Sequence, residues 1–177
     1  MLIGVFSDVH DNLAALDRVL DLFERREIST LLFCGDFCSP IPARRIAAYP
    51  GQVHVVFGNG DGDRFAILRH AASEAPNLQL HGEHAELTLD SRRVAMTHYP
   101  LYAQALARTG DYDAVFSGHT HEAGIETHDT CLWVNPGEVL GWKGAPSCAI
   151  YDTEANGAEI IRLEAAPPPP PPRGSAG

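Results

Sequence analysis

The feature that most constrains this chain is a set of five short segments, each rich in metal-ligating side chains and each directly following an apolar run. The segments are Asp8-Val9-His10, Gly35-Asp36, Gly58-Asn59-Gly60-Asp61, Thr97-His98 and Gly118-His119-Thr120-His121. The preceding runs span residues 2–6, 31–34, 53–57, 94–96 and 114–116, and their composition is typical of buried β-strands. Because ligands at the ends of consecutive strands can converge on one rim of a sheet, we expect these side chains to lie close together.

The first half of the chain alternates predicted strands with predicted helices. The strands are expected over residues 2–6, 30–34 and 53–57. A helix capped by Asn12 is expected to end near Glu27, and a shorter helix is expected around residues 44–48. The buried face of the longer helix is marked by Leu13, Leu16, Val19, Leu20 and Phe23. This order predicts parallel strands joined by right-handed crossovers.

Predicted strands dominate after residue 78. They span residues 78–80, 85–89, 92–97, 114–117, 124–127, 132–135, 147–151 and 159–163. Turn signals lie between them at Asp90-Ser91, Asp129-Thr130 and Asn156-Gly157. Short helices are expected over residues 65–72 and 102–108. We therefore expect an α/β (α+β) fold with mixed sheets stacked as a sandwich and helices on the outside.

Length and charge limit the number of domains and the kind of partner. The 177 residues fit one domain, predicted over residues 1–165. Residues 166–177 include six consecutive prolines and are predicted to be a disordered tail, with a docking site for a proline-binding partner as the alternative. The net charge of -10 argues against an extended nucleic acid as partner. A small phosphorylated substrate stays compatible, because bound metal ions invert the local field. The oligomeric state is open.

The four cysteines and the apolar runs bear on location. No C-x-x-C pair and no signal peptide are visible, so we expect reduced thiols and a cytoplasmic protein. No apolar run approaches the length of a membrane span, so no membrane partner is expected. Cys34, at the end of a predicted buried strand, is expected to be an inert core thiol, whereas Cys38 lies near the predicted rim and its role is open.

The ligand types point to a particular chemistry. Carboxylate and carboxamide oxygens mixed with imidazoles suit a pair of divalent metal ions, and such a pair is well matched to phosphate-ester hydrolysis. Asp36 is the candidate bridge between the metals, because the bridging ligand must be anionic. Asn59 would coordinate without adding negative charge that repels phosphate. Asp36, Asn59 and His98 are the residues expected to act directly in catalysis.

The ordered motifs D-x-H, G-D, G-N-x-D, H and G-H-x-H resemble the calcineurin-like metallophosphoesterase superfamily. The opening Ser7-Asp8-Val9-His10-x-Asn12-Leu13 is similar to that of its small bacterial and archaeal phosphodiesterases, and the resemblance covers residues 2 to about 152. It implies a four-layer α/β/β/α sandwich with two mixed β-sheets flanked by helices. It also implies phosphodiester hydrolysis, in which a hydroxide bridging two metal ions attacks phosphorus in line with the leaving group.

The resemblance further implies the ligand set. One metal would be held by Asp8, His10, Asp36 and His121, and the other by Asp36, Asn59, His98 and His119. Manganese is the expected metal, and iron, nickel, cobalt and zinc also tolerate mixed nitrogen and oxygen ligands.

Four positions depart from the superfamily pattern. Gly60 stands where many relatives have a histidine that assists the leaving group, and loss of a general acid typically costs about 100- to 10,000-fold in rate. Asp11 replaces a common glycine and would act as a proton donor or repel a doubly charged monoester. Tyr99-Pro100 also replaces a glycine and would narrow the pocket or stack on a substrate, and Glu138 follows Asn135-Pro136-Gly137 where serine is usual.

Several alternatives compete with these assignments. Residues 58–63 could be read as a calcium loop, but the flanking strand opposes an EF-hand. The histidines outside the motifs are expected to be structural, namely His54, His70, His81, His84 and His128. The alternative functions are a phosphomonoesterase or nucleotide hydrolase of the same fold, and a non-catalytic metal-binding scaffold. The complete ligand set argues against the scaffold, whereas Gly60 and the proline tail favour it mildly.

Overall fold

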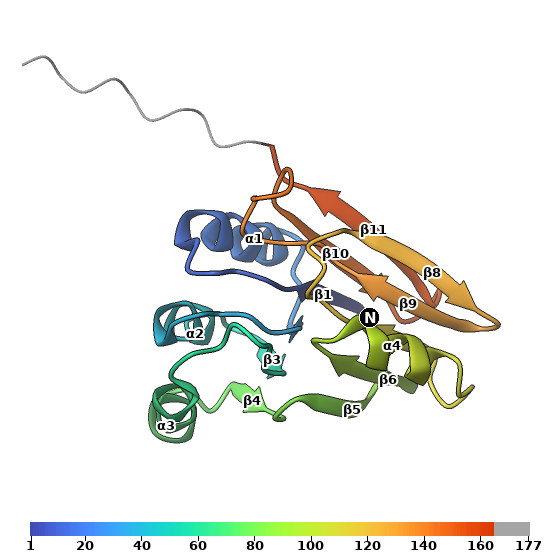
Figure 1. Cartoon of the computed structure of the whole chain (residues 1–177), viewed down its shortest axis with the longest axis horizontal. Coiled ribbons are helices and arrows are strands. Elements are labelled where there is room, and N and C mark those ends of the chain that lie inside the picture. The colour runs from blue at the N-terminus through green and yellow to red at the C-terminus, as the bar shows by residue number, and fades with distance from the viewer. Residues whose placement is uncertain (165–177) are drawn as a thin grey trace, which may run out of the picture.

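The structure is a computed structural model that describes residues 1–164 (Figure 1). The helices are α1 (Leu13–Arg25), α2 (Pro40–Ala47), α3 (Arg64–Glu74) and α4 (Pro100–Ala107). The strands are β1 (Leu2–Phe6), β2 (Thr30–Phe33), β3 (Gln52–Val55), β4 (Leu78–Leu80), β5 (His84–Leu89), β6 (Arg92–Thr97), β7 (Ala114–Phe116), β8 (Gly124–His128), β9 (Cys131–Asn135), β10 (Ser147–Asp152) and β11 (Gly157–Arg162). The predicted domain boundary at residue 165 and the predicted proline-rich tail lie outside the described residues.

The strands form two mixed sheets. The first has the order β11-β10-β1-β2-β3-β4, and its strands β1 to β4 are parallel, as the alternation of strands and helices predicted. The second has the order β5-β6-β7-β9-β8, with a parallel centre of β6, β7 and β9 and an antiparallel strand at each edge. The three predicted turns close the hairpins β5-β6, β8-β9 and β10-β11, so these predictions are confirmed.

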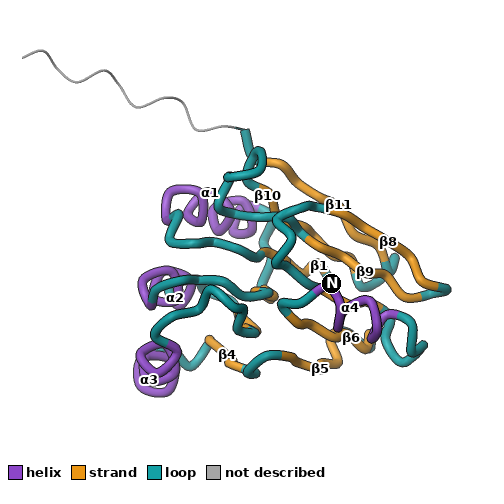
Figure 2. The backbone as a smooth tube through the Cα atoms, viewed as in Figure 1, coloured by secondary structure: helices purple, strands orange, loops and turns teal. Residues whose placement is uncertain are grey.

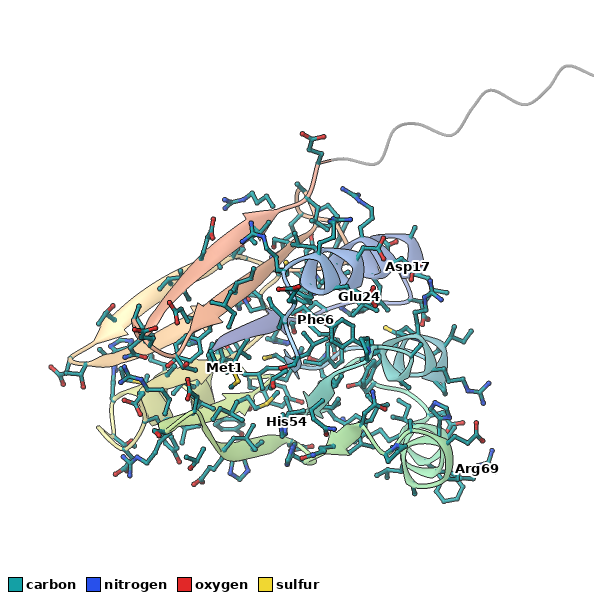
Figure 3. All side chains as sticks on the ribbon, turned by 180° about the vertical axis from the view of Figure 1, so that it is seen from behind. Met1, Phe6, Asp17, Glu24, His54 and Arg69 are labelled. Carbon is teal, nitrogen blue, oxygen red and sulfur yellow. The ribbon has the colours of Figure 1, made fainter. Side chains whose placement is uncertain are left out.

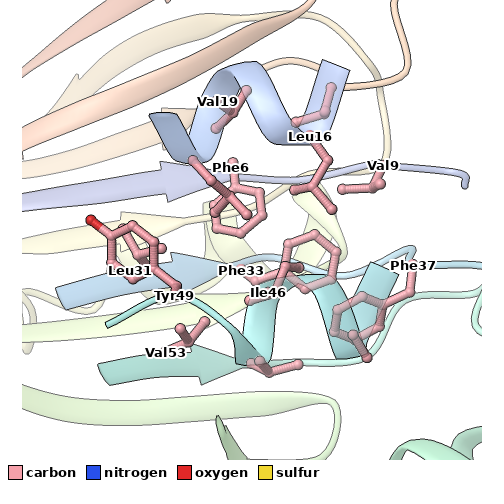
Figure 4. Close-up of a cluster of buried hydrophobic side chains, with 14 of the residues drawn as sticks. Phe6, Val9, Leu16, Val19, Leu31, Phe33, Phe37, Ile46, Tyr49 and Val53 are labelled. Carbon is pink, nitrogen blue, oxygen red and sulfur yellow. The ribbon is translucent and has the colours of Figure 1, made fainter. Parts of the chain in front are cut away.

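Three apolar cores separate four layers. Helices α1, α2 and α3 cover the outer face of the first sheet, and Figure 4 shows part of the core beneath them. The second core lies between the sheets, and a smaller third core lies between the second sheet and α4. Strand β2 is apolar at successive positions because both of its faces are buried. Leu31 and Phe33 face the helices, while Leu32 faces the other sheet. The expected four-layer sandwich is therefore confirmed.

The helix starts differ from the prediction in an instructive way. Helix α2 begins at Pro40 rather than near residue 44, with Ser39 accepting a hydrogen bond from the Ile41 N–H. Helix α4 likewise begins at Pro100 rather than at residue 102. Proline fits the first helical turn because its missing N–H has no partner to lose there. The expected Asn12 cap is confirmed, since its side chain accepts a hydrogen bond from the Ala15 N–H.

The loops carry the polar segments away from the apolar cores. The loops after β1, β2 and β3 lead into α1, α2 and α3, which Figure 2 shows in teal and purple. In the view from behind, Asp17 and Glu24 lie on α1 and Arg69 on α3, so this helical layer presents charge to solvent (Figure 3). Among residues 1–164, none of the helices combines the length and apolarity that a membrane crossing requires.

Candidate metal centre

The five predicted segments meet at one place, but they come from two sheets rather than one. Asp8 and His10 follow β1, Asp36 follows β2 and Asn59 follows β3 in the first sheet. His98 follows β6, and His119 and His121 follow β7, in the second sheet. The expectation of a single sheet rim is therefore corrected: stacking places the rims of both sheets side by side, and the candidate ligands face one another across them.

One group of donors gathers around Asp8. Its Oδ1 lies 3.3 Å from Nε2 of His121 and 3.7 Å from Nε2 of His10. These three donor atoms all lie within 4.8 Å of one another, which suits a shared metal ion. Oδ1 of Asp8 and Nε2 of His10 are buried and have no hydrogen-bond partner among the described residues. Buried polar atoms without partners are costly, and a metal ion between them would satisfy both.

A second group adjoins the first through Asp36. Oδ2 of Asp36 lies 3.5 Å from Nε2 of His10 and 3.5 Å from Nε2 of His98, so this carboxylate sits between the two groups. Nε2 of His98 is also 3.1 Å from Oδ1 of Asn59 and 3.3 Å from Nδ1 of His119. All seven residues predicted from the sequence are thus brought together, with Asp36 in the central position expected of a bridge.

The remaining ring nitrogens have partners that orient the imidazoles. Nδ1 of His98 donates to the carbonyl of Cys34 at 2.8 Å, which leaves Nε2 of the neutral ring without a proton and available to a metal. Nδ1 of His121 lies 2.6 Å from Oε2 of Glu138, and Nδ1 of His10 lies 3.0 Å from Sγ of Cys38.

Glu138 contacts the candidate ligand His121, and sequence reasoning assigned it no role. It is only 2% exposed, and its second oxygen accepts a hydrogen bond from the Lys143 N–H. A buried carboxylate against a ligating histidine is the usual way to fix the tautomer of that ring. The departure from serine at this position was the available signal, but nothing local in the sequence connects it with His121.

Asp61 links the loop that carries Asp36 to the loop that carries Asn59. Its carboxylate accepts hydrogen bonds from the N–H groups of Asp36, Phe37 and Gly58. Burial raises the pKa of Asp61, and the nearby Asp36 adds to the rise. The three hydrogen bonds act in the opposite direction but do not cancel the effect of burial. The sequence placed Asp61 inside a motif without a role, and the structure shows that it holds the loop of Asp36 against the loop of Asn59.

The loop backbones adopt unusual conformations where they carry the candidate ligands. Asp8, His10, Asp36, His119 and His121 have φ between 44° and 73°, a left-handed region that non-glycine residues rarely adopt. Such conformations cost free energy and collect at functional sites, where surrounding structure enforces them. Gly118 permits the close approach of the loops, because a Cβ there would lie 1.9 Å from Oγ of Ser7 and 2.6 Å from Oδ2 of Asp8.

In the metal-free site, neighbouring side chains shift one another's pKa values. Burial acts to raise the pKa of Asp8, but the hydrogen bond with His10, the charge of His98, the hydroxyl of Ser7 and the charge of His121 together outweigh it and lower that pKa. The Asp8 carboxylate in turn raises the pKa of His10, against the effect of burial. An ionised Asp8 carboxylate beside imidazoles favours a cation, and binding of a divalent ion would compete with protonation of His10.

Comparison with known proteins agrees with this geometry. A family model described as the calcineurin-like phosphoesterase superfamily domain matches residues 1–156. The chain belongs to the calcineurin-like phosphoesterase superfamily. A phosphodiesterase of Methanocaldococcus jannaschii is 30% identical over 167 residues, which cover 93% of this chain and all of that protein. The phosphodiesterase YfcE of Escherichia coli K12 is 29% identical over 78% of this chain and 79% of its own length.

A solved structure extends the comparison within the calcineurin-like phosphoesterase superfamily. A structure described as that of a novel archaeal phosphodiesterase has a TM-score of 0.85 at 29% identity, covering 92% of this chain and all of that one. The likeness therefore spans both sheets and the helices that carry the ligand loops. In this chain, the superfamily fold brings together groups of carboxylate and imidazole donors that could bind a divalent metal ion.

The structure shows what surrounds the residues that depart from the superfamily pattern and the two cysteines near the site. Asp11 accepts hydrogen bonds from the N–H and the hydroxyl of Ser39, so it ties the first ligand loop to the start of α2. The Tyr99 ring lies 5.2 Å from the ring of His98 and 5.7 Å from that of His119. Cys34 is fully buried, and the pKa of the half-buried Cys38 thiol is raised to about 11 by burial and neighbouring carboxylates. Both thiols are therefore protonated and poorly nucleophilic.

Proposed function

We propose that this protein is a phosphodiesterase that hydrolyses small phosphodiesters at a site for two divalent metal ions. The observation that carries the proposal is the position of Asp36, whose Oδ2 lies at 3.5 Å from a ring nitrogen of each donor group. The unpartnered buried atoms of Asp8 and His10 support metal occupancy. The names of the relatives support the diester as substrate.

In this proposal the donor groups divide between two ions that share Asp36. The first ion would be held by Asp8, His10, Asp36 and His121, and the second by Asp36, Asn59, His98 and His119. Manganese is the proposed metal, with iron, nickel, cobalt and zinc as alternatives, because all accept mixed oxygen and nitrogen ligands. When bound, the pair would supply Lewis acidity and water made nucleophilic at neutral pH.

The chain itself provides the charge balance and the orientation. Only Asp8 and Asp36 of the seven proposed ligands are anionic, so a loaded site keeps an excess of positive charge and attracts a phosphodiester despite the acidic body. The neutral amide of Asn59 contributes to this excess by coordinating without charge. Glu138 and the Cys34 carbonyl hold His121 and His98 in the orientations that face the carboxylates.

Protonation of the leaving group is the step for which the chain supplies least. Gly60 has no side chain, and the carboxylate of Asp11 is engaged by Ser39. We therefore expect the enzyme to favour esters whose leaving groups need little protonation, such as aryl or other acidic alcohols. The proposed location is the cytoplasm, in keeping with the four free cysteines.

Turnover by metal-stripped protein, with and without added manganese, tests the proposal. The substrates are bis-p-nitrophenyl phosphate and p-nitrophenyl phosphate, and the variants are Asp36→Ala, His119→Ala and, as a matched control, the exposed surface histidine change His84→Ala. We expect metal-dependent hydrolysis that favours the diester, is abolished in the two site variants and is unchanged in the control. Faster hydrolysis of the monoester would favour a phosphomonoesterase, and bound metal without turnover would favour a scaffold.

A further inference from the structure

One aromatic side chain at the site has no role in metal binding. Trp142 is 76% exposed, and its ring lies 6.2 Å from the ring of His121 at 80°. A single exposed apolar residue is ordinary on a protein surface. What distinguishes this indole is its position beside a proposed metal ligand and the way in which its loop is held.

The loop of Trp142, residues 139–146, is fastened to the site on both sides of the indole. Before it, the N–H groups of Val139 and Leu140 donate to the carbonyls of Ser7 and Asp8. After it, the Lys143 N–H donates to Glu138, whose other oxygen holds His121. The same elements that position the proposed ligands therefore also position the indole.

A third anchor comes from the side chain that follows Trp142. Nζ of Lys143 donates to the carbonyl of Thr120 at 2.7 Å and lies 3.3 Å from the carboxylate of Glu122. Thr120 stands between the two histidines of the rim loop. An exposed aromatic face with polar groups beside it suits a planar ring that also has hydrogen-bonding edges. An acyl chain would instead need a continuous apolar surface.

Aromatic side chains also lie on the other side of the donor groups. The Tyr99 ring lies beside His98 and His119, and the half-exposed Tyr102 packs edge-on against Tyr99 at 5.8 Å. Trp142 therefore lies beside His121 of the first donor group, and the tyrosine pair lies beside His98 and His119 of the second. A phosphodiester has two ester groups, so each could extend toward one of these aromatic walls.

We infer that Trp142 is a substrate-binding residue that stacks on an aromatic ring of the diester, and that the substrates are small phosphodiesters carrying a nucleobase. The inference rests on the proposed function, because it names the substrate class of the same site. The acidic net charge of -10 limits such substrates to cyclic mononucleotides, dinucleotides or short oligonucleotides. Base stacking on aromatic side chains is strong enough to set affinity, and removal of the platform typically weakens binding by about 5- to 100-fold.

Binding measured without turnover tests the inference. Zinc-loaded protein is titrated with adenosine 5′-phosphate, a product of the proposed hydrolysis, and with ribose 5-phosphate, which is the same phosphate without the base. Affinities are measured by isothermal titration calorimetry, which does not depend on Trp142, and indole fluorescence is followed in parallel. The variants are Trp142→Ala, Trp142→Phe and the control Phe65→Ala, which removes an equally exposed aromatic residue from α3. Trp133, whose indole N–H donates to Oγ of Ser117, remains in every variant as a reference.

We expect the adenosine ligand to quench the wild-type fluorescence and to bind about 5- to 100-fold more weakly to Trp142→Ala. Trp142→Phe should restore most of the affinity, and Phe65→Ala should not change it. Ribose 5-phosphate should bind the wild type and Trp142→Ala equally. Equal binding of both ligands to the wild type, or unchanged adenosine affinity in Trp142→Ala, would overturn the inference. Because no turnover is measured, this result is separate from any failure to find phosphodiesterase activity.

Discussion

Nδ1 of His121 lies 2.6 Å from Oε2 of Glu138, a carboxylate that the fold buries almost completely. The contact joins a proposed metal ligand after β7 to a loop residue after β9, and the second oxygen of the same carboxylate holds the loop of Trp142. One buried side chain therefore orients a ligand and also fixes the position of the proposed substrate platform.

Glu138→Gln should weaken metal binding by about 10- to 100-fold, because an amide offers one acceptor where the carboxylate offers two and cannot stabilise positive charge on the ring. Metal titration followed by competition with a chelator measures the change. Glu122→Gln, at an exposed carboxylate that contacts Lys143, is the control and should bind metal as the wild type does. Equal metal affinity in Glu138→Gln and wild type would contradict a positioning role.

Asp61→Ala should destabilise the fold by roughly 2–5 kcal/mol, because three buried N–H groups lose their only described side-chain acceptor. Urea unfolding of metal-free protein measures the free energy of unfolding without a contribution from metal. Asp111→Ala removes an exposed carboxylate and should change the stability little. A loss no larger than that of the control would show that water satisfies these N–H groups.

Gly118→Ala should cost about 1–3 kcal/mol and reduce metal occupancy, because the added methyl group would overlap Ser7 and push the Asp8 carboxylate from its position. Thermal unfolding and metal analysis of the purified variant provide the two readouts. Gly124→Ala is a matched control, since a Cβ at that position meets nothing within 4 Å. Normal occupancy and stability in Gly118→Ala would mean that the rim loops can separate without loss.

His54 should make the fold less stable in mild acid. Burial lowers its pKa from the usual value near 6.5 to about 4, and the adjacent His81, with ring nitrogens 3.0 Å apart, adds to the effect (Figure 3). Between these two pH values His54 is protonated in the unfolded chain but neutral in the folded chain. The free energy of unfolding therefore falls by about 2–3 kcal/mol as the pH decreases from about 6.5 toward 4.

Denaturant unfolding of metal-free protein across this pH range measures the slope. His54→Gln should flatten it, whereas His84→Gln, at an exposed site, should leave it unchanged. An identical slope in His54→Gln and wild type would assign the acid sensitivity to other groups.

The sequence by itself determined the strands, and it predicted the candidate ligand residues and their order. An apolar run between turn residues is a local signal, and each ligand segment directly follows such a run, so Asp36 or His98 could be recognised without knowledge of distant residues. The helix periodicity that begins at Leu13 is local in the same way. Errors arose where a local signal was ambiguous, as at Pro40, where proline suits both a loop and a first helical turn.

Only the tertiary structure decided which chain segments surround those ligands. The joining of two sheet rims brings Asp36 to His98, and β10 pairs with β1, placing the preceding loop against Asp8. Glu138 and Trp142 reach His121 through that pairing. Their contacts depend on strand pairings between distant parts of the chain, and no periodicity along the sequence records such pairings, because each is selected by the packing of the whole core.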